Sequence, residues 1–189
     1  MYRRIFVMAA VMISASRAIG DVTVFANKPG WEAAVRGNFS TIDFTGFADG
    51  TPISNQYLSE GVTFSGLAFI FASAIFVNDG WGLHGPGGLH IAFGSRQNWV
   101  GVDYPGAVEF QLFNDGQLFY TSPFFQPGGV GNFAGLVSDT NFDEVYIFRP
   151  APFENQVFID DLHWGPAIPA PGALGLFFVT ALSSRRRRE

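Results

Sequence analysis

Three aspartates in strand-like surroundings are the residues of this sequence best suited to hold a metal ion. Asp43 lies between two large apolar residues, and Asp160 and Asp161 are adjacent in the segment 157–162. Because successive strand residues face opposite sides, one carboxylate of the adjacent pair must point inward or to a rim, where it needs a cation or hydrogen bonds. The first and last strands of a β-sandwich are often neighbours, so Asp43 and Asp160 can share one ion. Oxygen ligands alone favour Ca²⁺; the alternative is surface acids, or carboxylates bound to backbone N–H groups.

A glycine-rich segment, residues 78–90, offers groups that suit sugar binding. It holds five glycines and one proline. Trp81 offers a flat ring face to a sugar, with Asn78, Asp79 and His84 nearby to bind its hydroxyls. The alternative is a loop folded over the edge of the domain with Trp81 in the core, because tryptophan is heavily buried on average.

Neither zinc binding nor catalysis is indicated by the sequence. His84 and His90 are six residues apart and have no third nitrogen or thiolate ligand beside them, whereas zinc sites use closer pairs and four ligands. The chain has no cysteine and no Gly-x-Ser-x-Gly motif. The glycines at 85–88 lack the Lys-Ser or Lys-Thr of a phosphate-binding loop. The sequence therefore predicts a protein that is not an enzyme, with a glycan-active hydrolase as the least favoured alternative.

Short strands separated by turns must position these residues. Apolar and polar residues alternate over 108–113, and Asp115-Gly116 separates this segment from 117–121, which predicts a hairpin. Pro29 and Gly37 bracket a short helix at about 29–36. The other strands expected are 22–25, 41–45, 61–65, 67–71, 74–77, 89–93, 98–104, 131–137, 144–149 and 156–162. Their spacing, with Gly or Pro between them, predicts an all-β domain over 21–165: an antiparallel jelly-roll-type β-sandwich with one short N-terminal helix, a barrel being the alternative.

Charge is distributed unevenly along the chain. Seven of the 11 lysines and arginines lie near the two ends. Between residues 21 and 184, four basic and 15 acidic residues give a formal charge of −11. A surface of that sign repels phosphate backbones and attracts divalent cations, so nucleic acid is not expected as a partner.

Residues 1–20 have the order of a secretory signal peptide. Arg3 and Arg4 precede an unbroken apolar run over 5–13, and small residues follow at positions 14, 15, 16 and 18. An apolar run of nine residues is too short to span a bilayer. The sequence therefore predicts export with removal of this segment.

The C-terminal segment, residues 166–189, combines three features in a fixed order. Pro169, Ala170 and Pro171 come first, an apolar run over 172–184 follows, and the segment closes on four arginines: Arg185, Arg186, Arg187 and Arg188. This order resembles the PEP-CTERM sorting tail, in which a Pro-x-Pro motif, an apolar helix and an Arg cluster are recognised by an exosortase that cleaves near the motif. Ala170 stands where the name-giving motif has Glu. The resemblance implies a transmembrane helix that holds the chain briefly in the inner membrane of a Gram-negative bacterium before release to the surface or beyond.

The body of the chain resembles the globular part common in PEP-CTERM proteins, on segments such as 41–44, 61–64 and 157–162. It also resembles, more weakly, jelly-roll carbohydrate-binding modules, in which an early acidic strand and a late Ile-Asp strand share a structural calcium. The resemblance implies an exported cell-surface or extracellular-matrix protein, sorted by an exosortase-type system and associated with biofilm exopolysaccharide. The alternative is a calcium-dependent carbohydrate-binding module, and Ca²⁺ is the one cofactor expected.

Overall fold

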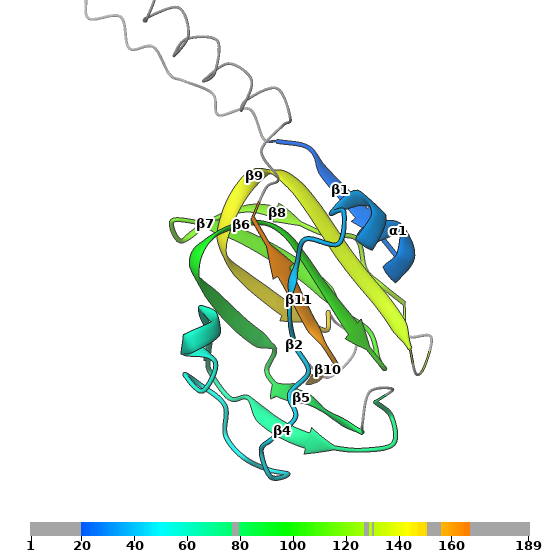
Figure 1. Ribbon diagram of the computed structural model, residues 1–189, viewed down its shortest axis with the longest axis vertical. Helices are drawn as coiled ribbons and strands as arrows, with labels where there is room; N and C mark the ends of the chain where they lie inside the picture. The colour runs from blue at the N-terminus through cyan, green and yellow to red at the C-terminus, as the bar shows by residue number, and fades with distance from the viewer. Residues whose placement is uncertain (1–19, 77–79, 127–128, 130, 151–155, 167–189) are drawn as a thin grey trace, which may run out of the picture.

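The computed structural model describes residues 20–76, 80–126, 129, 131–150 and 156–166, which form two antiparallel sheets packed face to face (Figure 1). The larger sheet has the strand order β2-β11-β6-β9-β7-β8, with β1 added to β9 and β3 to β6, and the smaller sheet has the order β10-β5-β4. The elements are β1 (Val22–Phe25), α1 (Lys28–Ala34), β2 (Ser40–Ile42), the 3₁₀ turn η1 (Leu58–Glu60), β3 (Val62–Ser65), β4 (Phe69–Ala72), β5 (Trp81–Pro86), β6 (Leu89–Tyr104), β7 (Glu109–Asn114), β8 (Gln117–Thr121), β9 (Asn132–Phe148), β10 (Gln156–Ile159) and β11 (Leu162–Gly165). The predicted antiparallel β-sandwich with one short N-terminal helix is confirmed.

Apolar side chains from the two facing sheets form the main core. The small sheet contributes Ile70, Leu83 and Ile159, and the large sheet contributes residues such as Val102 and Ile147, each exposing 1% or less of its surface. A second, smaller cluster lies on the opposite face of the large sheet, where α1 packs against it: Trp31, Val35, Trp99 and Phe133. One half of the large sheet is thus covered on both faces.

Two long strands run through both halves of the large sheet. Residues 89–93 and 98–104 were expected as separate strands, and so were 131–137 and 144–149, but each pair belongs to one strand, β6 or β9. The register of β6 against β9 shifts between Ala92 and Gln97 and again between Gln97 and Trp99. A bulge of this kind bends a strand without ending it, which is why the hydrophobic pattern is interrupted there.

The glycine-rich segment departs most from expectation. Residues 81–86 form β5, the central strand of the small sheet, although the composition predicted a loop. Gly82 is needed there because a Cβ atom would lie 2.5 Å from the Phe76 ring and 2.6 Å from the Ile159 carbonyl oxygen. The strand predicted at 74–77 is wrong, since its described part, 74–76, contains a turn at Ala74 and Ile75 and no strand residue. The segment predicted as one strand at 156–162 is two strands, β10 and β11, which belong to different sheets.

The helix α1 begins and ends with well-formed caps. The Asn27 side chain accepts a hydrogen bond from the Gly30 N–H at 2.8 Å, which satisfies one free donor of the first turn. At the other end Arg36 takes the left-handed conformation, with φ 54°, and the Gly37 N–H reaches back to the Glu32 carbonyl at 3.0 Å.

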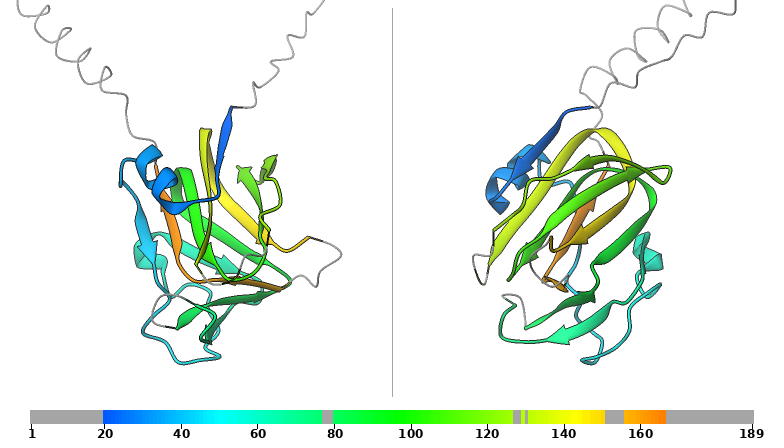
Figure 2. Two further views of the ribbon diagram at one scale, coloured as in Figure 1. Left: turned by 90° about the vertical axis from the view of Figure 1, so that its right-hand side faces the viewer. Right: turned by 180° about the vertical axis from the view of Figure 1, so that it is seen from behind.

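The described chain begins and ends at the same end of the sandwich (Figure 2). Among the described residues, no helix has the length and apolar character needed to cross a membrane. The predicted signal peptide (1–20) and sorting tail (166–189), including Pro169, Ala170, Pro171 and the four arginines, lie outside the described residues except for Gly20 and Pro166.

Candidate functional site

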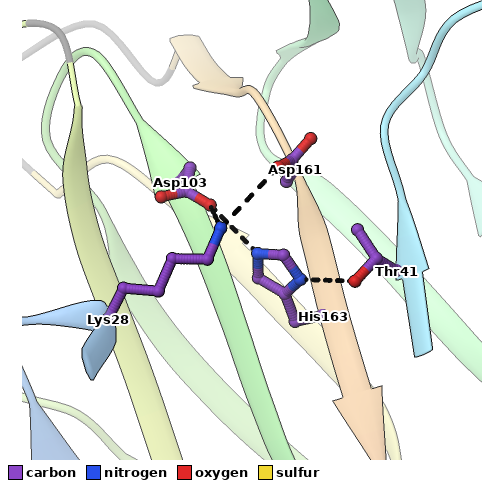
Figure 3. A network of polar contacts seen from close by, with 5 residues as sticks. All are labelled: Lys28, Thr41, Asp103, Asp161 and His163. Atoms are coloured by element: carbon purple, nitrogen blue, oxygen red, sulfur yellow. Dashed lines mark hydrogen bonds and ion pairs between the residues drawn. The ribbon is translucent and has the colours of Figure 1, made fainter. Parts of the chain in front are cut away.

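A buried polar cluster joins α1 to the large sheet (Figure 3). Lys28 comes from α1, Thr41 from β2, Asp103 from β6 and His163 from β11, while Asp161 immediately precedes β11. Strand alternation explains the placement. Because Val102 and Leu162 face the main core, their chain neighbours Asp103 and His163 face the opposite side, under α1.

His163 links a carboxylate to a hydroxyl. Its Nε2 is 3.0 Å from Asp103 Oδ2, and its Nδ1 is 2.8 Å from Thr41 Oγ1. A neutral ring satisfies both contacts when Nε2–H donates to the carboxylate and the Thr41 hydroxyl donates to Nδ1. Lys28 Nζ completes the cluster, since it donates to Asp103 Oδ2 at 2.6 Å and lies 3.8 Å from Asp161 Oδ2.

The two carboxylates of the cluster have opposite pKa shifts. Burial alone would raise the pKa of Asp103, but hydrogen bonds from His163 and Lys28 outweigh it and the pKa is lowered. Burial, together with the charges of Asp160 and Asp103, raises the pKa of Asp161 to about 6, although His163 and Lys28 oppose the shift. Direct hydrogen bonding to Asp103 therefore gives the two carboxylates different pKa values, although both are buried in the same cluster.

The predicted metal ligands are only partly brought together. One ligand atom each from Asp103, Asp161 and His163 lie within 4.8 Å of one another, and this group can hold a metal ion. Asp160 is buried beside it, and its N–H donates to the Asp103 carbonyl at 2.7 Å. Asp43 is not part of the group: its side chain is exposed and accepts hydrogen bonds from the Thr45 N–H and hydroxyl at 3.1 and 2.9 Å. The strand pairing expected for Asp43 is nevertheless present, because β2 pairs with β11.

The donor set of this group fits calcium poorly. Ca²⁺ usually takes about six to eight oxygen ligands, whereas two carboxylates and an imidazole resemble the sites of zinc and other transition metals. The Lys28 ammonium also contacts both carboxylates, so it already supplies a positive charge at that position. A divalent cation bound to these carboxylates would compete with the Lys28 ammonium.

Thr41, His163 and Asp103 are hydrogen-bonded in the same order as the nucleophile, base and acid of many hydrolases. The His163 ring is 2% exposed and is surrounded by aromatic rings, with centroids 5.8 Å from Trp31, 5.3 Å from Phe39 and 6.1 Å from Phe133. Both of its nitrogens are occupied. This arrangement holds α1 on the sheet and leaves no reactive face of the imidazole for a substrate.

The residues predicted to bind glycan fall on different faces. Asn78 and Asp79 lie outside the described residues. Trp81 is partly buried and packs against the main core from strand β5, not from the loop that the sequence predicted. His84 points to the other face of β5, where its ring stacks on Phe158 with centroids 4.4 Å apart and burial lowers its pKa.

A row of aromatic rings on the large sheet was missed by the sequence analysis. His90 on β6 and Tyr146 on β9 stack with centroids 4.1 Å apart, and Phe148 stacks on Tyr146 at 5.2 Å. We call these three residues the aromatic strip. They lie on the face of the large sheet that points away from the core, since Ile91, Val145 and Ile147 alternate with them and are fully buried. The alternation of apolar and polar residues at 144–149 indicated which side chains of this strand face outward. It did not predict that the strand pairs with β6.

Hydrogen-bonding side chains flank the aromatic strip. Glu144 Oε1 lies 3.2 Å from His90 Nδ1, and their side chains are 34% and 43% exposed. Gln111 on β7 is paired with Tyr146, and Glu109 is paired with Phe148. Partial burial raises the pKa of Glu109. The surface thus combines ring edges and faces with carboxylate and amide groups.

No known protein family and no curated protein match this chain. Among solved structures, a mutant of CBM29-2, a family 29 carbohydrate-binding module, is similar over 71% of this chain and 99% of its own, with 13% sequence identity and a TM-score of 0.37. That likeness is too distant to indicate what this chain binds.

Proposed function

We propose that this protein is a non-catalytic β-sandwich that binds polysaccharide across the outer face of its large sheet. The observation that carries the proposal is a row of paired residues perpendicular to the strands, formed by Ser65, His90, Tyr146, Gln111 and Thr121. The row crosses β3, β6, β9, β7 and β8. With strands about 4.8 Å apart it extends roughly 19 Å, which suits a short stretch of a longer sugar chain.

The chemistry of this row matches a sugar chain. The C–H groups of a sugar ring pack against aromatic rings, and its hydroxyls bind carboxylates and amides. His90 and Tyr146 supply rings in the row, Phe148 adds a third beside it, and Gln111 and Glu144 supply polar groups. A neutral or basic polysaccharide also avoids repulsion by the acidic chain.

Export and sorting form the second part of the proposal, and they rest on the sequence of the two ends. The protein is exported by its signal peptide and held briefly in the inner membrane by its tail. An exosortase-type enzyme then processes the tail, and the β-sandwich acts at the cell surface or in the extracellular matrix with exopolysaccharide. The acidic, non-catalytic domain takes no nucleic acid partner.

Affinity electrophoresis tests polysaccharide binding. The full chain, in a detergent without sugar headgroups, is run through gels that contain the exopolysaccharide of the producing bacterium. We expect retardation of the wild-type protein, and its loss in the double variant His90→Ala, Phe148→Ala. Phe158→Ala is the matched control, because it removes a partly exposed ring from the small sheet. Wild-type mobility unchanged by the polysaccharide would refute the proposal, and loss only in Phe158→Ala would move the site to the small sheet.

Ion-dependent binding is the second candidate, with calcium as the ion that the sequence predicted. The group Asp103, Asp161 and His163 is the observation that favours an ion, although its donor set suits zinc better than calcium. The group lies under α1, and α1 contacts β1 and β9. An ion there acts on binding through the stability of the sheet. Running the same gels with calcium and with a chelator distinguishes the cases: calcium-controlled retardation supports this candidate, and equal mobility in both gels refutes it.

A further inference from the structure

The aromatic strip has a carboxylate at each of its edges. On β9, Glu144 precedes Tyr146 by two residues and Phe148 follows it by two, so all three lie on the same face. Glu109 on β7 is paired with Phe148. Strand geometry places Glu109 and Glu144 roughly 14 Å apart, on opposite sides of the row that crosses Tyr146. A polymer that lies along this row therefore meets one carboxylate at each edge.

The two glutamates have little positive charge around them. Among the ion pairs of the described residues, the one that involves either glutamate joins Glu144 to His90 at 3.2 Å, and both side chains remain partly exposed. Burial is the cause of the raised pKa of Glu109, and no described cation opposes it. The chain from 21 to 184 has a formal charge of −11. The field at the strip therefore attracts cations and repels uronic acids and sulfate esters.

The four lysines and arginines of the described chain leave this field in place. Lys28 and Arg96 are each bonded to an aspartate. Arg36 lies at the end of α1, and Arg149 follows Phe148 directly but has a buried Nε. A positive group for Glu109 and the partly exposed Glu144 must therefore come from the ligand.

Desolvation decides which sugars suit such a surface. A ligand on the strip displaces water from Glu109 and Glu144, and a carboxylate that loses water is destabilised unless it gains an opposite charge or hydrogen bonds. An ammonium group supplies both, through a charge-assisted hydrogen bond. The faces of Tyr146 and Phe148 attract an ammonium group as well. Rings beside carboxylates thus favour a sugar with a free amine over a neutral or an acidic sugar.

We propose that the polysaccharide bound along the aromatic strip contains amino sugars with free, protonated amines, which bind the carboxylates of Glu109 and Glu144. This inference rests on the proposed function, because it assigns the chemistry of the polymer at the same site. It separates such a polymer from a fully N-acetylated one, whose amide nitrogens carry no charge, and from polymers of uronic acids.

Chemical N-acetylation of the exopolysaccharide tests the inference without changing the protein. Acetic anhydride in aqueous bicarbonate converts each free amine into a neutral amide, and brief treatment with mild alkali removes acetyl esters formed on hydroxyls. The full chain, in a detergent without sugar headgroups, is run at about pH 6 through gels that contain the untreated or the N-acetylated polymer. We expect retardation by the untreated polymer, and an affinity for the N-acetylated polymer that is weaker by about fivefold or more.

The two gels distinguish failure of this inference from failure of the proposed function. Equal retardation by both polymers would overturn the amino-sugar assignment and leave polysaccharide binding in place. Mobility unchanged by either polymer would refute polysaccharide binding itself, and the assignment with it.

Variants show whether the amines bind at the strip. Glu109→Gln and Glu144→Gln should each weaken retardation by the untreated polymer about fivefold, and neither should weaken binding of the N-acetylated polymer. Glu32→Gln is the matched control, because it removes the same charge from α1, outside the strip. Circular dichroism checks the fold of each variant, and the N-acetylation result does not depend on any of them. If Glu32→Gln weakens retardation as much as the strip variants do, the polymer responds to the overall acidity of the chain and the assignment is wrong.

Discussion

The cluster under α1 shows how contact geometry decides the state of a buried carboxylate. Asp103 and Asp161 lie near the same ammonium group, but Lys28 Nζ is 2.6 Å from the first and 3.8 Å from the second. Asp103 also has a hydrogen bond from His163, which lowers its pKa. Desolvation therefore dominates at Asp161 and is outweighed at Asp103.

The raised pKa of Asp161 predicts a pH-dependent free energy of unfolding. Between its unfolded value of 3.8 and its folded value of about 6 the folded protein binds more protons, so stability falls as pH rises through that window. The shift of the Asp161 pKa corresponds to a loss of roughly 3 kcal/mol. Asp161→Asn removes the part of the pH dependence of the unfolding free energy that Asp161 causes. The variant should be more stable than the wild type above pH 6. Urea unfolding with chelator present, at pH 4 and at pH 7.5, measures the difference, and equal slopes for both proteins would contradict the assignment.

Removing the Lys28 ammonium predicts how the cluster responds to metal ions. Lys28→Met leaves Asp103 and Asp161 without their cation and should cost about 1–3 kcal/mol, less than for a fully buried pair because Lys28 is 31% exposed. A divalent ion can then take its place, and binding only to the folded state raises the melting temperature. Thermal melts with chelator, calcium or zinc compare the two proteins.

We expect a larger ion-induced rise for Lys28→Met than for the wild type, and a larger rise with zinc than with calcium. Equal melting temperatures in all three conditions for both proteins would remove metal binding from this cluster. Lys28→Arg is the control that keeps the charge, and it should respond to ions as the wild type does.

At the scale of elements, two glycines let α1 lie flat on the large sheet. Gly101 and Gly135 are paired across β6 and β9, and the Trp31 ring rests over them. A Cβ atom at Gly135 would lie 2.5 Å from Trp31 Cδ1 and 2.7 Å from the Phe133 ring. This close approach brings Lys28 within reach of Asp103.

Gly135→Ala should therefore displace α1. The clash with Trp31 and Phe133 resembles overpacking of a core and should destabilise the protein by about 1–3 kcal/mol. Gly106→Ala is the matched control, because a Cβ atom there meets nothing within 4 Å. Guanidinium unfolding followed by tryptophan fluorescence measures both variants. Equal stabilities would show that α1 does not depend on these glycines.

The elements that the sequence predicted well are those with local signals. The alternation over 108–113 and the Asp115-Gly116 turn correspond to β7, β8 and their hairpin. The segment 81–86 was wrongly predicted as a loop because its glycines were taken to mark a turn. Gly82 and Gly85 instead lie in a strand and allow Phe76 and Leu89 to approach it closely. Which of these two meanings a glycine has depends on its neighbours in space.

The candidate site was predictable only in part for a related reason. Asp161 was identified from its apolar strand context. Asp103 meets Lys28 and His163 only when positions 75 and 60 residues away from it in the chain come together. Asp103 lies in a segment, 98–104, that was predicted as a strand, but no local pattern shows that α1 covers one face of that strand.

At the scale of the whole molecule, the large sheet uses the two halves of its outer face differently. α1 and the second cluster cover one half, and the aromatic strip lies open on the other. The first and last elements of the described chain leave the sandwich at the same end (Figure 2). A tether attached to that end leaves the small sheet and the loops beside it farthest from a membrane.

The proposed processing of the two ends predicts where the sandwich is found in the cell. In a bacterium with an exosortase, a chain with an epitope after Glu189 should lose that epitope, and the sandwich should reach the surface or the medium. Replacing all four of Arg185, Arg186, Arg187 and Arg188 by Ala removes the charge that we propose holds the end on the cytoplasmic side, and should leave unprocessed chain in the membrane fraction. Immunoblots of cell fractions, probed for the epitope and for the sandwich, measure both outcomes.

Arg36→Ala and Arg149→Ala together form the control, because they remove positive charge from the sandwich and not from the tail. Epitope and sandwich found together outside wild-type cells would show that the tail is not a sorting signal, and the protein would then be exported by its N-terminal segment alone.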